Sequence, residues 1–398
     1  MQKTSKMGSA ERQGGVLNTL FSKVLAFIGG PVIISYVVAG IIILALVGNS
    51  VTQLSGSNLS AESKAASNEI TAYFDRYYSM AEDLAVNQQI IQALTDLNGS
   101  LGDVTQYQYY NQLVQTFANT VEGGGDALLA VYAADPDANE LLHSDNFVAP
   151  DTFVVEERPW YIQMKKEGKT ILTEPYEDAV TGAQTVTVAT PVFKPGTSEI
   201  IGGVGVDFVL DELVKQVASY QLGEDGFYIL TTAAGQIMYD PVKDEIYKNI
   251  ADIDLSDKVK DALLANQEGS FEYELNGQEN HGYISAVGDT GWMLTTGLPD
   301  SEFYKSFNMV RTTLILIFAL VTVAIIIIIL IVSRQIVGGI KSLKETADQI
   351  ADGNLNIEAH IRSKDETGQM ADAINRTVEQ LRRYTAYIKE ISSTLENM

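Results

Sequence analysis

Two long uncharged apolar runs constrain this chain of 398 residues more than any other feature. Val24–Gly48 holds no charged residue over 25 positions, and Thr312–Ser333 holds none over 22. A bilayer core of roughly 30 Å needs about 20 apolar residues in a helix, so each run can span a membrane. A cleaved signal peptide is the alternative for the first run, but its apolar part would have only about 7–15 residues. We therefore expect a membrane protein with transmembrane helices at 24–48 and 311–333.

The basic residues beside these runs predict how the chain is oriented. The polar segment 1–23 contains three lysines and one arginine, and Arg334, Lys341 and Lys344 follow the second run. Segments rich in lysine and arginine stay on the cytoplasmic side of a membrane. Both termini are therefore expected in the cytoplasm, with residues 1–23 as a short tail and residues 49–310 outside the cell membrane.

Charge and composition exclude several classes of function. Residues 49–310 contain 13 basic and 40 acidic residues, a net charge of −27, against −24 for the whole chain. Such an acidic segment repels nucleic acid, so no nucleic-acid partner is expected. The chain has no cysteine, and its three histidines lie far apart, so no disulfide, metal site or cofactor is expected. No Ser-His-Asp set or pair of glutamates points to an enzyme.

The external segment begins with a helical pattern over residues 49–94. Apolar side chains recur there at alternating spacings of four and three residues: Ala66, Ile70, Tyr73, Tyr77, Met80 and Leu84. This spacing gives one apolar stripe along a long helix. The stripe could pack on its own domain or on the same helix of a second copy.

After Gly123–Gly125 the pattern changes to short strands separated by turns, which predicts two α+β units with antiparallel sheets. The first unit covers about residues 95–219 and the second about residues 220–300. Asn276-Gly277 is the strongest hairpin signal. Strands are expected at 127–133, 140–144, 170–176, 184–193, 200–208, 226–231, 236–239, 270–275, 281–287 and 291–298. Helices are expected near 158–168, 211–220 and 243–266.

The stretch from Phe153 to Asp178 is the most specific part of the chain. Arg158 is the only arginine between Arg76 and Arg311, and Trp160, Tyr161 and Tyr176 lie near it in sequence. An arginine fork fits a carboxylate bidentately, and carboxylates hold an ammonium, so one cation among acids and aromatics suits a small zwitterion. The alternative is structural. Arg158 would then pair with a neighbouring glutamate, at 156 or 157, and Trp160 would lie in a core.

These residues also carry a resemblance to a known family. The external region resembles a double Cache domain, the two-lobed sensor of bacterial receptors. Gly223–Tyr228 and Gly235–Pro241 resemble the strand-turn-strand signature of its membrane-proximal lobe. In the distal lobe, family members that bind amino acids carry an Arg-x-Trp-Tyr, a Tyr-x-Asp and a later Asp. The motif commonly has a tyrosine five residues before the arginine, where this chain has phenylalanine. The residues that match or replace motif positions are Phe153, Arg158, Trp160, Tyr161, Tyr176, Asp178 and Asp207.

The resemblance implies a fold and a site. Two PAS-like lobes with antiparallel sheets would be carried on the long N-terminal helix. Arg158 would hold the carboxylate of an L-amino acid, with Phe153, Trp160 and Tyr161 shaping that end. Asp178 and Asp207 would hold the ammonium, helped by Tyr176.

Beyond the second apolar run the chain resembles a HAMP domain, over residues 334–387. Asp365–Gly368 matches the acidic start of its second helix, and apolar residues then recur every three or four positions from Met370 to Met398. Sustained heptads predict a coiled coil, hence a homodimer. Residues 388–398 look like the start of a continuing signalling helix. A plain juxtamembrane coiled coil is the alternative.

Taken together, the chain looks most like the front part of a methyl-accepting chemotaxis protein of the amino-acid-sensing type. Its kinase-coupling machinery would be reached through a further C-terminal module. The sensor part of a histidine kinase or a diguanylate cyclase is the second hypothesis. A ligand-free membrane protein that binds a partner protein is the third.

Overall fold

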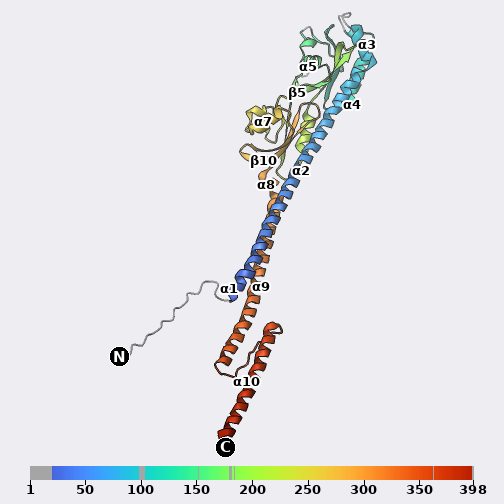
Figure 1. Cartoon of the computed structure of the whole chain (residues 1–398). Helices are drawn as coiled ribbons and strands as arrows, with labels where there is room; N and C mark the ends of the chain where they lie inside the picture. The colour runs from blue at the N-terminus through green and yellow to red at the C-terminus, as the bar shows by residue number, and fades with distance from the viewer. Residues whose placement is uncertain are drawn as a thin grey trace, which may run out of the picture. The chain divides into compact units, whose positions relative to one another are not determined.

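The computed structural model describes residues 20–97, 104–150, 152–178, 182, 184–361 and 363–396. It contains two compact units: the external unit Ser50–Ser306, and a membrane and cytoplasmic unit formed by the residues before and after it. Figure 1 labels the helices and strands of both. Most of the tail expected at 1–23 and the last expected heptad position, Met398, lie outside the described residues.

Within the described residues, two helices are long and apolar enough to cross a membrane. The first comprises α1 (Leu20–Val24), a π-helical turn (Leu25–Gly29) and α2 (Gly30–Ala85). The π turn lies just before Pro31, which has no N–H to complete a regular helical turn, so the widened turn accommodates the proline without ending the helix. The second is α9 (Lys305–Ala351).

Glycines let these two helices pack closely within their unit. A Cβ on Gly40 would lie 3.1 Å from the ring of Phe318, and one on Gly29 would lie 3.2 Å from Ile329. The Phe318 ring also contacts Tyr36, with ring centroids 5.2 Å apart. Small residues allow this approach in a membrane, where helices associate by packing contacts.

The long helix expected at 49–94 is interrupted. After α2 ends at Ala85, the side chain of Asn87 accepts a hydrogen bond from the backbone N–H of Gln89 at 2.9 Å, and α3 (Gln88–Leu97) begins. Asn is a favoured residue for starting a helix because its side chain satisfies a free N–H. The apolar stripe packs on its own domain: Ile70 and Tyr77 are fully buried in the core of the external unit.

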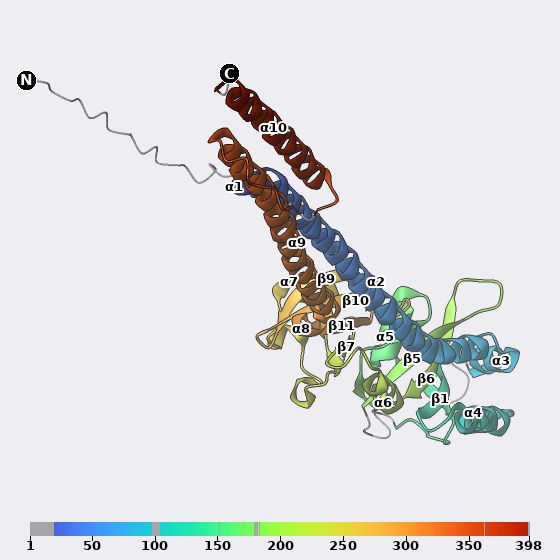
Figure 2. The ribbon, with the colours of Figure 1, turned by 90° about the horizontal axis from the view of Figure 1, so that it is seen from below.

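The distal lobe is a six-stranded antiparallel sheet in the order β2-β1-β6-β5-β3, with β4 paired to β5. Its strands are β1 (Leu128–Asp135), β2 (Glu140–His143), β3 (Ile171–Leu172), β4 (Tyr176–Glu177), β5 (Gln184–Phe193) and β6 (Ile200–Phe208). The helices are α3, α4 (Tyr110–Gly124) and α5 (Pro159–Glu167). Figure 2 shows α3 following α2 and α4 lying beside β1, while α5 packs with the opposite face of the sheet.

The membrane-proximal lobe follows along α2 (Figure 1) and has a five-stranded antiparallel sheet in the order β8-β7-β11-β10-β9. Its strands are β7 (Phe227–Thr231), β8 (Ile237–Tyr239), β9 (Gly269–Leu275), β10 (Gln278–Ala286) and β11 (Met293–Pro299). Its helices are α6 (Asp211–Ser219), which leads into it, then α7 (Asp257–Leu264) and α8 (Asp300–Phe303). Both residues of Asn276-Gly277 have positive φ, as the predicted hairpin turn requires.

The prediction of a helix over residues 243–266 is mostly wrong. The structure has two short 3-10 turns, Lys243–Glu245 and Ile250–Asp252, and then the eight-residue α7. Tyr247 adopts a positive φ of 69°, which no helix can contain, and the side chain of Asn249 accepts a hydrogen bond from Ala251 to start the second turn.

Strand β6 packs directly on the long helix α2 in the core of the external unit. The Phe208 ring stacks on Tyr77 of α2, with centroids 3.8 Å apart and planes 9° apart, and both residues are fully buried. The preceding residue, Asp207, points to the other face of the sheet because side chains alternate along a strand. A change at Asp207 is therefore one residue away from the contact with α2.

We expect Phe208→Ala to lower the free energy of unfolding of the external unit by about 3–5 kcal/mol, because it leaves a cavity in a packed core. Guanidinium titration followed by the fluorescence of Trp292, which contacts Phe74 in the same core, measures it. Phe193→Ala is the matched control, since Phe193 ends β5 and is 38% exposed. Equal losses in the two variants would contradict this account of the core.

In the cytoplasmic part, the helix α10 (Glu366–Glu396) starts where the sequence predicts. The Asp365 carboxylate accepts hydrogen bonds from the hydroxyl and backbone N–H of Thr367, and these lower the pKa of Asp365 to about 2. Leu343, Ala359 and Ala371 form a small buried cluster. Ile374 packs against this cluster and is half-buried, whereas later apolar heptad positions, among them Leu381 and Ile388, are exposed in the single chain.

Candidate functional site

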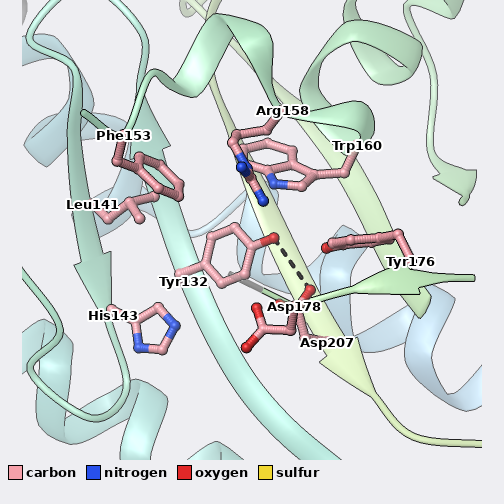
Figure 3. A pocket seen from close by; sticks show the side chains of 9 residues that line it. All are labelled: Tyr132, Leu141, His143, Phe153, Arg158, Trp160, Tyr176, Asp178 and Asp207. Atoms are coloured by element: carbon pink, nitrogen blue, oxygen red, sulfur yellow. Dashed lines mark hydrogen bonds between the residues drawn. The ribbon is translucent and has the colours of Figure 1, made fainter. Parts of the chain in front are cut away.

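The distal sheet, the loop before α5 and the segment after β4 enclose a small buried cavity of about 20 Å³, room for about one water. Figure 3 shows the nine side chains that line it: Tyr132, Leu141, His143, Phe153, Arg158, Trp160, Tyr176, Asp178 and Asp207. Six of the seven residues predicted from sequence are thus brought together. Tyr161 is not among them.

Tyr161 lies behind the cavity wall. It is buried against Trp160, with ring centroids 5.6 Å apart and the planes perpendicular. Successive residues of an α-helix point about 100° apart, so two neighbours at the start of α5 cannot both face one cavity. Its contact with the site is indirect, through Trp160.

Arg158 is held at the N-terminus of α5. Pro159 occupies the first turn of that helix, and Arg158 before it is extended, as a residue preceding proline prefers. The guanidinium lies over the Phe153 ring, 5.0 Å from its centroid. Glu156 pairs with Lys165 at 2.7 Å, and among the residues that the structure describes no acid forms an ion pair with Arg158. The ion pair of the structural alternative is therefore not found, but its second part is: Trp160 is 2% exposed and lies in a hydrophobic core cluster.

Asp207 lies at the opposite end of the cavity, inside a hydrogen-bond chain. Its Oδ1 accepts from the Thr187 hydroxyl at 2.6 Å and from the Tyr132 hydroxyl at 3.2 Å. Since the Thr187 hydrogen is used on Asp207, Tyr176, 2.6 Å from the Thr187 oxygen, donates to Thr187. Figure 3 shows Asp178 beside Asp207 and Arg158 beside Trp160, with Tyr132 between the two ends.

Burial and neighbouring charges shift the pKa values of Asp207 and Tyr132 at the acidic end of the cavity. Burial, with the nearby Asp178 carboxylate, raises the pKa of Asp207 from 3.8 to about 7, although the Thr187 and Tyr132 hydroxyls act against the shift. Burial and the Asp207 charge also raise the pKa of Tyr132. The cavity therefore holds an acid that is poised between its neutral and charged forms, opposite an arginine that is always charged.

Tyr132, Leu141 and His143 are cavity residues that the sequence reasoning missed. Tyr132 pairs with His143 on β2 and with Gly205 on β6, and its ring stacks on His143. A Cβ on Gly205 would lie 2.2 Å from the Tyr132 ring, so this glycine lets the ring lie across β6 toward Asp207. His143 is buried, with its Nδ1 2.6 Å from Asp145, and burial lowers its pKa.

No metal is indicated at this cavity. Within the described part of the chain, no three or more His, Asp or Glu side chains gather in a way that could hold a metal ion. The arrangement offers a planar donor at one end, two carboxylates at the other and aromatic walls. These charges would complement a small molecule that carries separated opposite charges.

Comparison with known proteins gives two family matches. The model of the Cache domain matches residues 46–307, and that of the HAMP domain matches residues 331–383. A solved structure with the same fold is the extracellular domain of a protein assigned as a histidine kinase, mmHK1S-Z2. It is 18% identical, covers 63% of this chain and 99% of its own, and has a TM-score of 0.51.

Two relatives are similar in sequence. The methyl-accepting chemotaxis protein McpA of Pseudomonas putida is 30% identical over 61% of this chain and 37% of its own length. The methyl-accepting chemotaxis protein PctB of Pseudomonas aeruginosa is 25% identical over 69% of this chain and 43% of its own. The ligand-binding domain of PctB solved with L-Arg is 21% identical over 63% of this chain and 97% of that domain, with a TM-score of 0.44. The chain thus spans about two fifths of the length of these relatives.

Proposed function

The chain belongs to the Cache domain family, with a HAMP domain after its second candidate membrane helix, and we propose that it is the sensor part of a transmembrane chemoreceptor. In this proposal the distal lobe binds an extracellular L-amino acid. The signal passes through α9 and the HAMP domain to kinase-coupling machinery, and the chain itself catalyses no reaction. Residues 49–310 lie outside the cell membrane and both termini lie in the cytoplasm, as the basic flanks predict.

One observation carries the choice of ligand: Arg158 and the Asp178–Asp207 pair occupy opposite ends of one buried cavity. An amino acid carries a carboxylate and an ammonium a few ångströms apart. Its carboxylate would take the guanidinium fork, and its ammonium would take the two carboxylates. Trp160 and Tyr132 would exclude water, which strengthens both contacts.

The relatives support this choice. Several are methyl-accepting chemotaxis proteins, and PctB, similar in sequence over most of this chain, is an amino acid chemoreceptor solved with L-Arg. The sensor part of a histidine kinase is the second candidate, since mmHK1S-Z2 shares the fold. The coding sequence that follows residue 398 in the gene separates the two.

Calorimetry on the full chain in lipid nanodiscs tests the proposal, with the twenty L-amino acids added singly. We expect at least one of them to bind at one site per chain. The cavity is small without ligand, so we also expect slower association for larger side chains, which must displace Tyr132 or Leu141. Absence of binding by every amino acid would leave a partner-protein role as the better account.

Affinity should depend on pH through Asp207. Its pKa of about 7 must fall when a ligand ammonium binds, so below pH 7 binding has to release a proton. Between pH 8 and pH 6 we expect the dissociation constant to rise about tenfold. A free amino acid stays zwitterionic over this range.

Calorimetry in two buffers of different ionisation enthalpy measures the released proton directly. His143→Gln is the control, because it removes the other group at the cavity that can titrate in this range. An affinity that stays constant from pH 8 to pH 6 would contradict a role for Asp207.

The stability of the ligand-free protein should depend on pH in the opposite direction. Between about pH 4 and 7 the folded state holds a proton on Asp207 that the unfolded state lacks. Stability from this group therefore falls as pH rises through that window.

A path for the signal follows from the contacts of Asp207. Drawing this carboxylate toward an ammonium moves β6, and Phe208 on that strand stacks on Tyr77 of α2. The same helix continues into the first span. We propose that binding shifts α2 against the last strand, β11, and that the HAMP domain converts this displacement.

We also propose a homodimer, because most heptad positions of α10 are apolar and exposed in the single chain. The chain has no cysteine, so an introduced one is the only thiol. Leu381→Cys should form disulfide-linked dimers in membranes on mild oxidation. Glu379→Cys, on the outer side of the same helix, should not. Failure of both Leu381→Cys and Ile374→Cys to cross-link would contradict the dimeric coiled coil.

A further inference from the structure

The membrane-proximal lobe repeats the strand order of the distal lobe and has a cleft of its own. Strands β8-β7-β11-β10-β9 correspond in sequence order to β2-β1-β6-β5-β3. The cleft lies where β7 and β10 begin and β8 and β9 end, and it measures about 460 Å³, against about 20 Å³ for the distal cavity. We call it the proximal cleft. Its size falls within the range of small-molecule sites.

Asn280, one of the residues that line the proximal cleft, has a side-chain oxygen with no hydrogen-bond partner among the described residues. Asn280 on β10 is 2% exposed, and its Nδ2 donates to the carbonyl of Gln278 at 2.7 Å. That bond fixes which end of the amide carries the oxygen. The Oδ1 atom is fully buried and accepts no hydrogen bond from any described residue. A buried acceptor left unpaired is costly, so this atom calls for a donor.

Asp240, just after β8, lines the same cleft and is 4% exposed. One of its oxygens accepts the backbone N–H of Val242 at 2.7 Å, and among the described residues no cation pairs with it. Burial raises the pKa of Asp240 to about 6, and its charge raises the pKa of the buried Tyr273. At neutral pH the carboxylate is therefore mostly charged, buried and without a counter-ion, which a bound cation would supply.

The remaining walls fit an organic cation. The rings of Tyr220, Tyr228 and Tyr239 line the cleft, and Tyr220 and Tyr228 meet edge to face with centroids 5.5 Å apart. Aromatic faces attract ammonium groups and cover apolar carbon. The acidic Glu224 at the rim is paired with Lys305 at 2.6 Å, so that lysine is engaged.

The lobe lacks what an amino acid or an acid would need. Arg158 and Arg311 are consecutive arginines, so residues 220–300 contain no guanidinium to bind a carboxylate. The described residues also offer no group of three ligands for a metal ion. A ligand that is positively charged, carries N–H donors and has no carboxylate satisfies every group in the cleft.

We propose that the proximal cleft is a second ligand site, which binds a small primary amine as its ammonium. The ammonium donates to Asp240 and to the Oδ1 of Asn280, and its hydrocarbon part lies on the tyrosine rings. This inference goes beyond the proposed amino-acid site and does not depend on it.

The cleft is placed to act on the transmembrane signal. The backbone N–H groups of Glu224 and Asp225, at its rim, donate to the Glu302 carboxylate of α8 at 2.5 and 2.7 Å. Lys305, the first residue of α9, binds Glu224. A ligand that moves this rim therefore pulls directly on the start of the helix that becomes the second span.

The test uses the full chain in nanodiscs carrying Asp178→Asn and Asp207→Asn, which together remove both acids of the distal cavity. Calorimetry is run with 2-phenylethylamine, butylamine and putrescine at pH 7.5. We expect at least one of them to bind. Adding Asp240→Asn should weaken that amine about tenfold or more, since hydrogen bonds to charged groups are the stronger ones. Asp261→Asn, an exposed acid on α7 outside the cleft, should leave it unchanged.

Two ligand controls need no further substitution, so they hold even if Asp240→Asn lowers the stability of the chain. The alcohol 2-phenylethanol has no charge and should not bind. The trimethylated form of 2-phenylethylamine keeps the charge but has no N–H for Asn280, and it should bind more weakly. The proposal is overturned if no amine binds at up to roughly 10 mM. It is also overturned if amine binding to the unaltered chain disappears with Asp178→Asn and Asp207→Asn, or if the alcohol binds as well as the amine.

Discussion

Arg158→Ala is expected to weaken binding of the amino acid by roughly 30- to several-thousand-fold, because truncating one side of a buried charge pair costs about 2–5 kcal/mol. No other described arginine or lysine lines the cavity, so no second cation can take over the carboxylate. The Phe153 ring beneath the guanidinium has no hydroxyl to offer in its place. Calorimetry on the full chain with the best amino acid measures the loss.

Two variants show whether the loss belongs to the site. Lys165→Ala removes a positive charge about two helical turns further along α5, where Lys165 is exposed and paired with Glu156, and it should not alter binding. Arg158→Lys keeps the positive charge but not the planar fork, so its affinity for the amino acid should lie between those of Lys165→Ala and Arg158→Ala. Unchanged affinity in Arg158→Ala, with an unchanged melting temperature, would mean that the ligand lies elsewhere.

The part of the site around Arg158 was predicted from residues that are close in sequence, whereas Asp207, 49 positions away, was carried over from the family motif. Arg158-Pro159-Trp160 is a local unit: the proline begins a helix, and the residue before it is forced to be extended. Such a unit keeps its geometry in any fold that retains the helix. Tyr161 was the exception, because a motif names neighbours without saying which face of the helix each occupies.

The residues that were missed depend on sheet register. Tyr132 reaches the cavity because β1 pairs with β2 on one side and β6 on the other, and that pairing joins residues more than 70 positions apart. Strand β1 is buried on both faces, so no alternation of polar and apolar residues reveals which face is which. Gly205 was visible as a signal, since a glycine within an apolar strand often marks a ring lying across it.

The state of Asp207 could not be read from sequence at all. An acid near the end of a strand is ordinary. The pKa of Asp207 depends on burial, on the Thr187 and Tyr132 hydroxyls and on Asp178, which come from three other segments of the chain. The helix break at Asn87 and the left-handed Tyr247 are similar cases. In each, one side chain or one φ angle interrupts a helix that the residue pattern predicts to be continuous. The long apolar runs and the heptads, in contrast, are periodic over many residues and were predictable.

Ligand charge should decide affinity at the distal site: an L-amino acid first, a simple amine second and a dicarboxylate last. At pH 8 succinate or malate should bind at least about 100-fold more weakly than the best amino acid, because like-charge contacts cost several kcal/mol. One carboxylate would pair with Arg158, but the second would face Asp178 and Asp207. The external segment, with its net charge of −27, also repels free anions within the screening distance of about 8–10 Å.

The affinity of a simple amine should lie between those of the amino acid and the dicarboxylate, because an amine pairs only with the acidic end of the distal cavity. Its ammonium would neutralise the two acids, but the half-buried Arg158 would be left without a partner, which is costly. The measurement is calorimetry at pH 8 on the full chain carrying Asp240→Asn, so that binding in the proximal cleft does not add to the amine signal. Asp178→Asn is the matched change: it should weaken the amino acid and relax the discrimination against succinate.

The same physics predicts how this order changes with acidity. Asp207 takes up a proton near pH 7, so at pH 6 the acid end carries less negative charge and the disadvantage of a dicarboxylate should shrink, while the amino acid loses affinity. The two effects have opposite signs and a single cause, so they must appear together. Tight binding of a dicarboxylate at pH 8, with no response to any amino acid, would show that Asp178 and Asp207 do not face the ligand. Arg158 would then be the only residue of the proposed site whose assigned role is still supported.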